Sequence, residues 1–438
     1  MDQKIQLEKT IKDTLNWLNS IKNRANFRVK EVSLDINSSW SYENGAIRHT
    51  SHRFFNVIGV KYLDEDGKIT YLPLIDQWEI GTLGFIWRDS NSIPEVLVQA
   101  KIEPGNVGII QLAPSCQATA SNADRVHGGS ISPLSDVFGK DEVVVISDSL
   151  QSEQGTRFYH KLNRNVLAKL KNNNYKPEDV HKWLPVDVVL QMLKIDYLFN
   201  TDARSVLVCS DWEKLIGRKP FSSSNSKLSK ELMDSYNHEG LYVKTDKLKT
   251  EINDSKSRIA PTEIVPLNEL HGYRVDKSGV YPATKKPFSV KFIEVQTGYR
   301  EVKSWNQPII ESAGEGKVRL TCARIDGILH FLFKPVIEPG LINKIELSPD
   351  TVIEHRGAVE DTHTVKDSKI LIESWQSEEG GRFWFDKNLY QIADAGKTYL
   401  VPKGWVWLSL KQISELLKEG GWLTNETRSV LSLIMTWL

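Results

Sequence analysis

The feature that most constrains the fold of this chain is a long internal repeat. Four blocks occur twice in the same order, at residues 102–105 and 337–340, 150–158 and 375–383, 183–184 and 407–408, and 203–207 and 427–431. The second pair reads LQSEQGTRF and WQSEEGGRF. A spacing of roughly 225 residues is far too long for a solenoid. The repeat therefore predicts two homologous domains, at residues 28–210 and 259–438.

The remaining segments predict how these two copies are built and joined. Apolar residues at helical spacing predict an amphipathic helix within residues 1–27, and the polar stretch 211–258 is typical of a linker with one short helix at 227–233. In the first copy we predict strands first and helices last, which favours an α+β class. The expected strands are 54–62, 69–75, 82–87, 96–102, 143–146 and 166–170, and the expected helices are 184–198 and, in the second copy, 408–417 with a Ser409–Gln412 capping box.

Composition excludes several functional classes. The 56 Lys and Arg residues equal the 56 Asp and Glu residues, which argues against a general nucleic-acid binder. Three scattered cysteines are too few for a disulfide framework or a zinc site. No apolar run has the length of a membrane span, and the first residues lack the apolar core of a signal peptide. We therefore expect a cytoplasmic protein without nucleic-acid or membrane partners.

The two copies differ at polar positions, and these differences point to a site in the first copy. Lys101 corresponds to Val336, Asn106 to Leu341 and Gln117 to Ile353. The run from Ser121 to His127 has no counterpart in the second copy. Residues needed only for the fold should recur in both copies, so we predict chemistry in the first and a scaffold role for the second. A different ligand or a regulatory role for the second copy is the alternative.

Several linked segments of the first copy together resemble the NDP-hexose 2,3-dehydratase family. They are residues 99–106, 117–119 with 121–122, 126–129, 151–155, and Lys161 with 163–165. The resemblance implies a dTDP-linked 4-keto-6-deoxy sugar as substrate, two Nudix-like domains per subunit, and a homodimer. The implied reaction removes water across C2 and C3 and needs no cofactor, because oxidation at C3 offsets reduction at C2.

A metal-dependent Nudix-type hydrolase is one competing interpretation. Such an enzyme needs clustered carboxylates, whereas Ser152 occupies the position where a hydrolase would hold a second metal-binding carboxylate. We therefore predict no metal site. A non-catalytic nucleotide-sugar-binding protein is the other alternative.

The implied reaction needs an electrophile for the C4 oxygen, a base for the C3 proton and an acid for the C2 hydroxyl. We predict Lys101 as the electrophile, with a phosphate contact as its alternative, and Glu103 and His127 as base and acid, with Tyr159 in reserve. Glu103 recurs as Glu338, which leaves a structural role open. The predicted substrate-binding residues are Gln111, Gln117, Thr119, Ser121, Asn122, Arg125, Gln151, Glu153, Arg157, Lys161, Asn163, Arg164 and Asn165. Trp78 or Trp87 could stack on the base.

Overall fold

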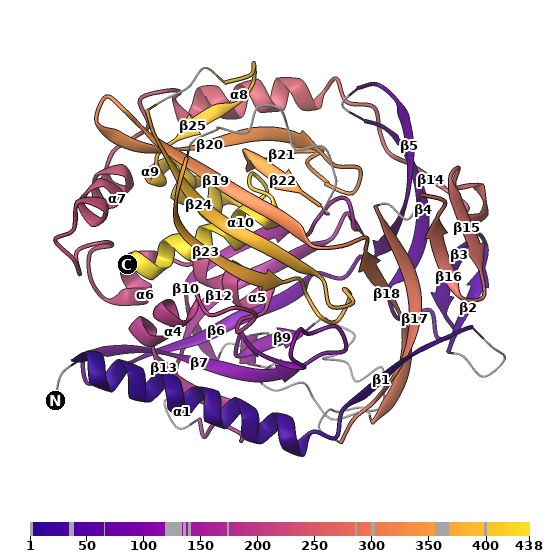
Figure 1. The fold of residues 1–438 in the computed structure, drawn as a ribbon, viewed down its shortest axis with the longest axis horizontal. Coiled ribbons are helices and arrows are strands. Elements are labelled where there is room, and N and C mark those ends of the chain that lie inside the picture. Colours follow the sequence, from indigo (N-terminus) through magenta and orange to yellow (C-terminus); the bar gives the residue numbers. More distant parts are fainter. Residues whose placement is uncertain are drawn as a thin grey trace.

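Each copy of the repeat forms a seven-stranded sheet with the same topology (Figure 1). The computed structural model describes residues 3–34, 39–64, 66–118, 134, 137–138, 142–172, 175–284, 287–298, 303–354, 368–397 and 401–438. The first sheet has the order β10 (Val143–Ser152), β12 (Leu162–Leu170), β6 (Gly81–Ser90), β7 (Ile93–Ile102), β13 (His181–Pro185), with β8 (Ile110–Ala113) on β7 and β9 (Cys116–Ala118) on β6. The second has the order β23 (Lys369–Ser377), β24 (Lys387–Lys397), β19 (Gly316–Ile325), β20 (Ile328–Ile337), β25 (Val406–Leu408), with β21 (Ile345–Pro349) on β20 and β22 (Thr351–Ile353) on β19.

The strand register confirms that the two sheets are equivalent and corrects one residue pairing. Gly81 pairs with Asn163 in the first sheet, as Gly316 pairs with Asn388 in the second. In the same frame Gln117 lies opposite Leu83, and Val352 lies opposite Val318. Gln117 therefore corresponds to Val352, and the expected match to Ile353 is wrong by one residue. The duplicated α+β architecture itself is as predicted.

Two smaller sheets exchange their first strands between the copies. One contains β2 (Trp40–Glu43), β3 (Ala46–His49), β4 (Asn56–Leu63), β5 (Ile69–Asp76) and β11 (Phe158–Tyr159), and the other contains β15 (Tyr273–Asp276), β16 (Gly279–Pro282), β17 (Phe288–Gln296) and β18 (Ser304–Ser312). β1 (Arg28–Val32) opens the first copy but pairs with β17, and β14 (Glu263–Val265) opens the second but pairs with β4. Each copy thus completes a sheet of the other.

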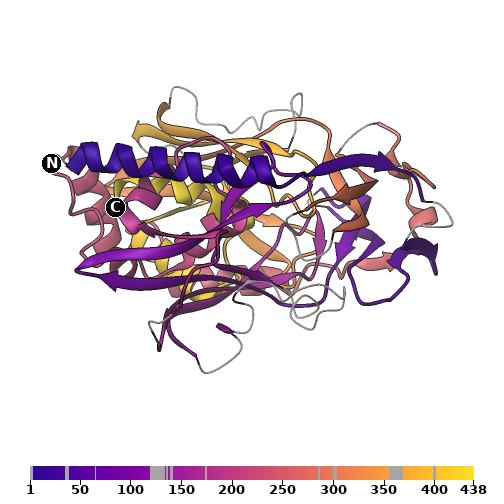
Figure 2. The same ribbon diagram turned by 90° about the horizontal axis from the view of Figure 1, so that it is seen from below.

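Helices cover the large sheets and differ from prediction in two places. They are α1 (Gln3–Arg24), α4 (Val186–Met192), α5 (Thr201–Cys209), α6 (Trp212–Ile216), α7 (Lys227–Asn237), α8 (Thr245–Lys256), α9 (Leu410–Glu419) and α10 (Asn425–Ile434). α1 lies along one side of the molecule (Figure 2). The expected linker contains three helices, α6 to α8. The expected helix 184–198 ends early, because Leu198 and Asn200 make backbone hydrogen bonds with Leu112 of β8.

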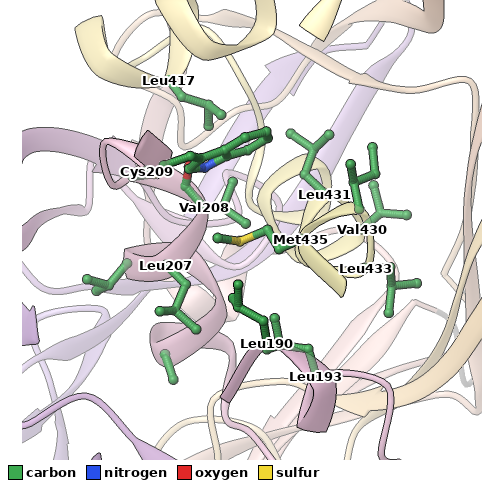
Figure 3. Close-up of a cluster of buried hydrophobic side chains, with 14 of the residues drawn as sticks. Leu190, Leu193, Leu207, Val208, Cys209, Leu417, Val430, Leu431, Leu433 and Met435 are labelled. Atoms are coloured by element: carbon green, nitrogen blue, oxygen red, sulfur yellow. The ribbon is translucent and has the colours of Figure 1, made fainter. Parts of the chain in front are cut away.

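The two copies share one hydrophobic core. α5 packs against α10, and buried side chains from both copies meet there, including Leu207, Val208, Leu431 and Met435 (Figure 3). The capping box of α9 forms as predicted, with Ser409 accepting from the Gln412 N–H and the Gln412 side chain accepting from the Ser409 N–H. Among the helices in the described ranges, none is long and apolar enough to cross a membrane.

Candidate active site between the two copies

The loops that carry the repeated motifs interlock across the two copies. The Gly105 N–H donates to Gly380 O at 2.7 Å, and in the equivalent contact the Gly340 N–H donates to Gly155 O at 2.8 Å. A Cβ atom on Gly105 would lie 1.6 Å from Phe383 O, so only glycine permits this approach. Each Glu-Pro-Gly loop therefore packs against the Gln-Ser-Glu loop of the other copy, and a site beside one includes residues of both.

Lys101 and Glu103 lie together at the end of β7. The Lys101 Nζ atom is 3.4 Å from Glu103 Oε1 and 3.5 Å from the backbone oxygen of Gln117. The side chains are 13% and 4% exposed, respectively, so the ion pair is shielded from water. The second oxygen of Glu103 is buried and has no hydrogen-bond partner among the described residues. This oxygen is available to a ligand, because an unpaired buried carboxylate oxygen is costly unless something else binds it.

Three further carboxyl groups lie near this ion pair. Asp202 is buried and Glu153 and Glu379 are half-buried, and loss of solvation is the main cause of their raised pKa values. Glu153 accepts hydrogen bonds from Asn163 and from Asn425 of the second copy. Burial raises the pKa of Glu153, and it raises the pKa of Asp202 well above its usual range, with Glu379, Glu153 and Glu103 adding to the shift. Burial and Glu103 raise the pKa of Glu379 to about 7. We call Lys101, Glu103, Glu153, Asp202 and Glu379 the first carboxyl cluster.

Two cations and an exposed aromatic ring lie beside the first carboxyl cluster. Lys161 Nζ donates to the backbone oxygen of Glu79, and burial lowers the pKa of Lys161 to about 8 despite the nearby Glu153. Arg382, from the second copy, donates to the Gln77 side chain at 3.3 Å. Between Gln77 and Glu79, Trp78 is 71% exposed. Segment 77–79 therefore contacts Lys161 and Arg382 and also carries an aromatic ring that is exposed to solvent.

The equivalent place in the second copy is chemically different. Val336 replaces Lys101 and Asp386 replaces Lys161. The acids there are Glu338, Glu346, Asp386 and Glu426, of which Glu346 and Asp386 are buried and the other two half-buried, with Arg157 donating to Glu354 nearby. Burial raises the pKa of Glu338 well above its usual range, and it raises the pKa of Asp386 to about 7. We call these acids the second carboxyl cluster. Because the second carboxyl cluster lacks equivalents of Lys101 and Lys161, it stabilises a developing negative charge less than the first carboxyl cluster does.

The structure brings part of the predicted site together at the first carboxyl cluster. Lys101, Glu103, Gln117, Glu153, Lys161 and Asn163 all contact it or belong to it. Asn165 follows on the same face of β12, where its Nδ2 donates to the backbone oxygen of Asn163. The predicted residues Thr119, Ser121, Asn122, Arg125 and His127 lie outside the described residues.

The remaining predicted residues make other contacts in the structure. Arg157 crosses to the second copy, where its guanidinium lies 4.1 Å from the Phe288 ring centroid, so it does not join the first cluster. Arg164 faces the opposite side of β12 and forms an ion pair with Asp148. Gln111 lies opposite Lys101 in the β7–β8 ladder, on the same face of the sheet, and its amide donates to Ser377 and Tyr197. Gln151 donates to Ser149 and Leu417, and Tyr159 stacks on His160 beside the core between the small sheets.

Sequence reasoning missed Asp202, Glu379 and Arg382 as neighbours of the site. A signal for Glu379 was present, because it replaces Gln154 of the first copy. Its place beside Lys101 was not predicted, since the loop exchange that brings residues 379–382 to Lys101 is not visible in the sequence. Trp87 packs against the core and its indole N–H donates to Leu215 O, so Trp78 is the more exposed of the two predicted stacking rings. Within the described residues, no group of three or more His, Cys, Asp and Glu side chains has an arrangement that could hold a metal ion.

Comparison with known proteins identifies similar sequences over nearly the whole chain. A family model described as NDP-hexose 2,3-dehydratase matches residues 11–210 and 247–434. The "dTDP-4-dehydro-6-deoxy-alpha-D-glucopyranose 2,3-dehydratase" of Streptomyces violaceoruber is 31% identical, covering 94% of each chain. Proteins with the same name from Saccharopolyspora spinosa and Amycolatopsis orientalis are 30% and 28% identical over 96% of this chain, and cover 90% and 89% of their own lengths.

Proposed function

Because the chain belongs to the NDP-hexose 2,3-dehydratase family, we propose that it removes the C2 hydroxyl of a dTDP-linked 4-keto-6-deoxyhexose. The product is the 3,4-diketo-2,6-dideoxy sugar, an intermediate for deoxysugar biosynthesis. The observation that carries the proposal is the buried Lys101–Glu103 ion pair, because its lysine is replaced by Val336 in the duplicate. This ion pair provides a cation and a base in one site that is shielded from water.

The proposed chemistry begins at C3, whose hydrogen is acidic because it neighbours the C4 ketone. Glu103 accepts the C3 proton, and the Lys101 ammonium holds the C4 oxygen as it becomes an enolate. A buried cation stabilises this charge more strongly than an exposed one, because water screens it less. The C2–O bond then breaks, the hydroxyl leaves as water, and the enol tautomerises with protonation at C2. His127 remains the predicted acid for the departing hydroxyl.

The same cluster suggests where the nucleotide binds. Lys161 and Arg382 supply cations for the diphosphate, and the arginine fork suits phosphate oxygens. The exposed ring of Trp78, next to the segment that contacts both cations, suits stacking on thymine. In this proposal Arg382 takes the role expected of Arg157, and Arg125 remains a predicted contributor.

The decisive experiment incubates the full chain with dTDP-4-keto-6-deoxyglucose, with and without EDTA, and follows the products by mass spectrometry. Loss of one water with the dTDP linkage intact, in both conditions, supports the dehydratase. Release of dTMP that stops with EDTA would instead support a metal-dependent hydrolase. Binding without turnover would indicate a nucleotide-sugar-binding protein.

We also propose that the protein works in the cytoplasm as a homodimer whose copies are Nudix-like. Cys116, Cys209 and Cys322 are free and buried, which suits a reducing compartment. The dimer rests on the family resemblance alone. Analytical ultracentrifugation at micromolar concentration measures the molecular mass, and a single species at twice the 49.9 kDa chain mass is the expected result.

A further inference from the structure

The second copy contributes a carboxyl group to the Lys101–Glu103 ion pair. We infer that Glu379 carries a proton during turnover and acts as a positioning residue, which leaves the Lys101 ammonium to Glu103 and to the developing enolate. The inference rests on the proposed function, and it adds a residue and a pH dependence that the proposed roles do not include. With Glu379 included, the site contains residues of both copies rather than of the first copy alone.

The geometry places the two carboxyl groups on either side of Gly381. The Glu379 Oε1 atom accepts the Gly381 N–H at 3.2 Å. A Cβ atom on Gly381 would lie 2.3 Å from Glu379 Oε1 and 3.5 Å from Glu103 Oε1. Both oxygens therefore border the same point in space, and glycine at this position leaves the space between them open. The unpaired Oε2 atom of Glu103 stays available as the acceptor for the C3 proton.

The charges around Glu379 favour its protonated form. The charged and titratable groups that face Glu379 are Glu103 and Lys101 on the first copy, Glu153 after β10, Asp202 on α5, and Arg382 on its own loop. Burial and the neighbouring Glu103 raise the pKa of Glu379 to about 7, although Arg382 and Lys101 oppose this shift. Lys101 contacts Glu103 directly at 3.4 Å, so the ammonium is already paired and Glu379 retains its proton below about pH 7.

The internal repeat provides a test of whether this acid serves only the fold. Glu379 corresponds to Gln154, which precedes Gly155, whose N–H donates to Glu338 of the second carboxyl cluster at 2.7 Å. The same loop therefore forms with a glutamine, so folding alone does not require a glutamate there. The glutamate is present only on the loop that faces Lys101.

Glu103 and Glu379 have different roles during the reaction. Glu103 takes the C3 proton and returns it to C2 during tautomerisation, while Glu379 keeps its own proton. The enol O3–H proton replaces the proton that the acid gave to the departing hydroxyl, so every group ends in its starting state. Above about pH 7 Glu379 also ionises. A second negative charge then competes with the enolate oxygen for the Lys101 ammonium, and turnover falls.

The experiment compares pH profiles of kcat and KM, from pH 5.5 to 9.5, for the wild-type chain, Glu379→Gln and Glu379→Asp. The amide mimics the protonated carboxyl, so Glu379→Gln should retain kcat within about tenfold at pH 6 and lose the decline that begins near pH 7. Glu379→Asp should restore that decline. Gln154→Ala, the matched position in the other copy, should show the wild-type profile.

Two results would overturn the inference. One is a Glu379→Gln profile that declines near pH 7 as the wild type does, and the other is a loss of kcat at every pH in a folded variant. Infrared difference spectra between pH 6 and 8.5 provide a readout without substrate. The wild type should lose one more protonated carboxyl group than Glu379→Gln does, because the other acids with a pKa of about 7 titrate in both proteins. An inactive wild-type protein would refute the proposed function, whereas an equal loss in the two proteins would refute a protonated Glu379.

Discussion

At the scale of single residues, Lys101 carries the largest part of the proposed catalysis. Loss of one donor to a developing oxyanion typically lowers kcat by roughly 10²- to 10³-fold. We therefore expect Lys101→Ala to lower kcat by about that factor while the fold is retained, because the equivalent position already holds Val336. Steady-state kinetics with the dTDP-ketosugar, together with a thermal unfolding curve, measure both effects.

The matched control is Lys169→Ala, which removes an exposed lysine from β12 of the same copy. It should keep kcat within about twofold. A Lys101→Ala protein with near-normal kcat would refute the electrophile assignment, and a protein with unchanged kcat but raised KM would indicate a phosphate contact instead.

The sequence alone could single out Lys101 and Lys161 as candidates, because the two copies provide an internal comparison, whereas Glu103 recurs as Glu338. It could not place Arg157 and Glu379, which lie on loops that cross to the other copy. Local patterns describe a loop's conformation but carry no information about the partner against which the loop packs. The first cluster therefore includes Asp202 and Glu379, which sequence reasoning did not predict.

At the scale of elements, local sequence patterns predict strands and helices but do not show which partners they pack against. Alternating apolar residues predicted β4 to β7 within a few residues, whereas the partners of β1 and β14 depend on contacts between the copies. The helical periodicity of residues 184–198 predicted one helix. Its last residues instead bond to β8, and the Asn200 side chain then caps α5.

The interlocked loops predict that Gly105 tolerates no side chain. A Cβ atom there would overlap Phe383 O at 1.6 Å, and backbone atoms cannot move aside as a flexible side chain can. We expect Gly105→Ala to lower the free energy of unfolding by at least about 2 kcal/mol, at the upper part of the usual range for overpacking. Turnover should fall as well, because Glu103 and Glu379 are held by these loops.

Urea denaturation followed by tryptophan fluorescence measures the stability change. Gly298→Ala is the control, because its Cβ atom would meet no atom closer than 3.6 Å. Equal stability of the two variants would show that the loops separate without cost, which would contradict the close packing described above.

At the scale of the whole molecule, the buried acids predict an unusual dependence of stability on pH. Burial raises the pKa values of Glu346, Glu379, Asp386 and Glu426 to about 7. In the unfolded chain these groups ionise near pH 4. Between about pH 4 and 7 the folded protein therefore binds more protons than the unfolded chain, so the free energy of unfolding falls as the pH rises through this window. Above about pH 7 these groups add no further slope.

Asp386 allows this prediction to be assigned to a single group. Its carboxyl accepts a hydrogen bond from Ser312, and burial is the main cause of its raised pKa. Asp386→Asn removes the titration, so the decrease in stability between pH 5.5 and 7 should become shallower by on the order of 1 kcal/mol per pH unit. Urea midpoints at four pH values, with Asp66→Asn as an exposed control, measure the slope. A steeper decrease in Asp386→Asn, or stability that rises from pH 5.5 to 7 in the wild type, would show that the second carboxyl cluster is ionised in the folded protein.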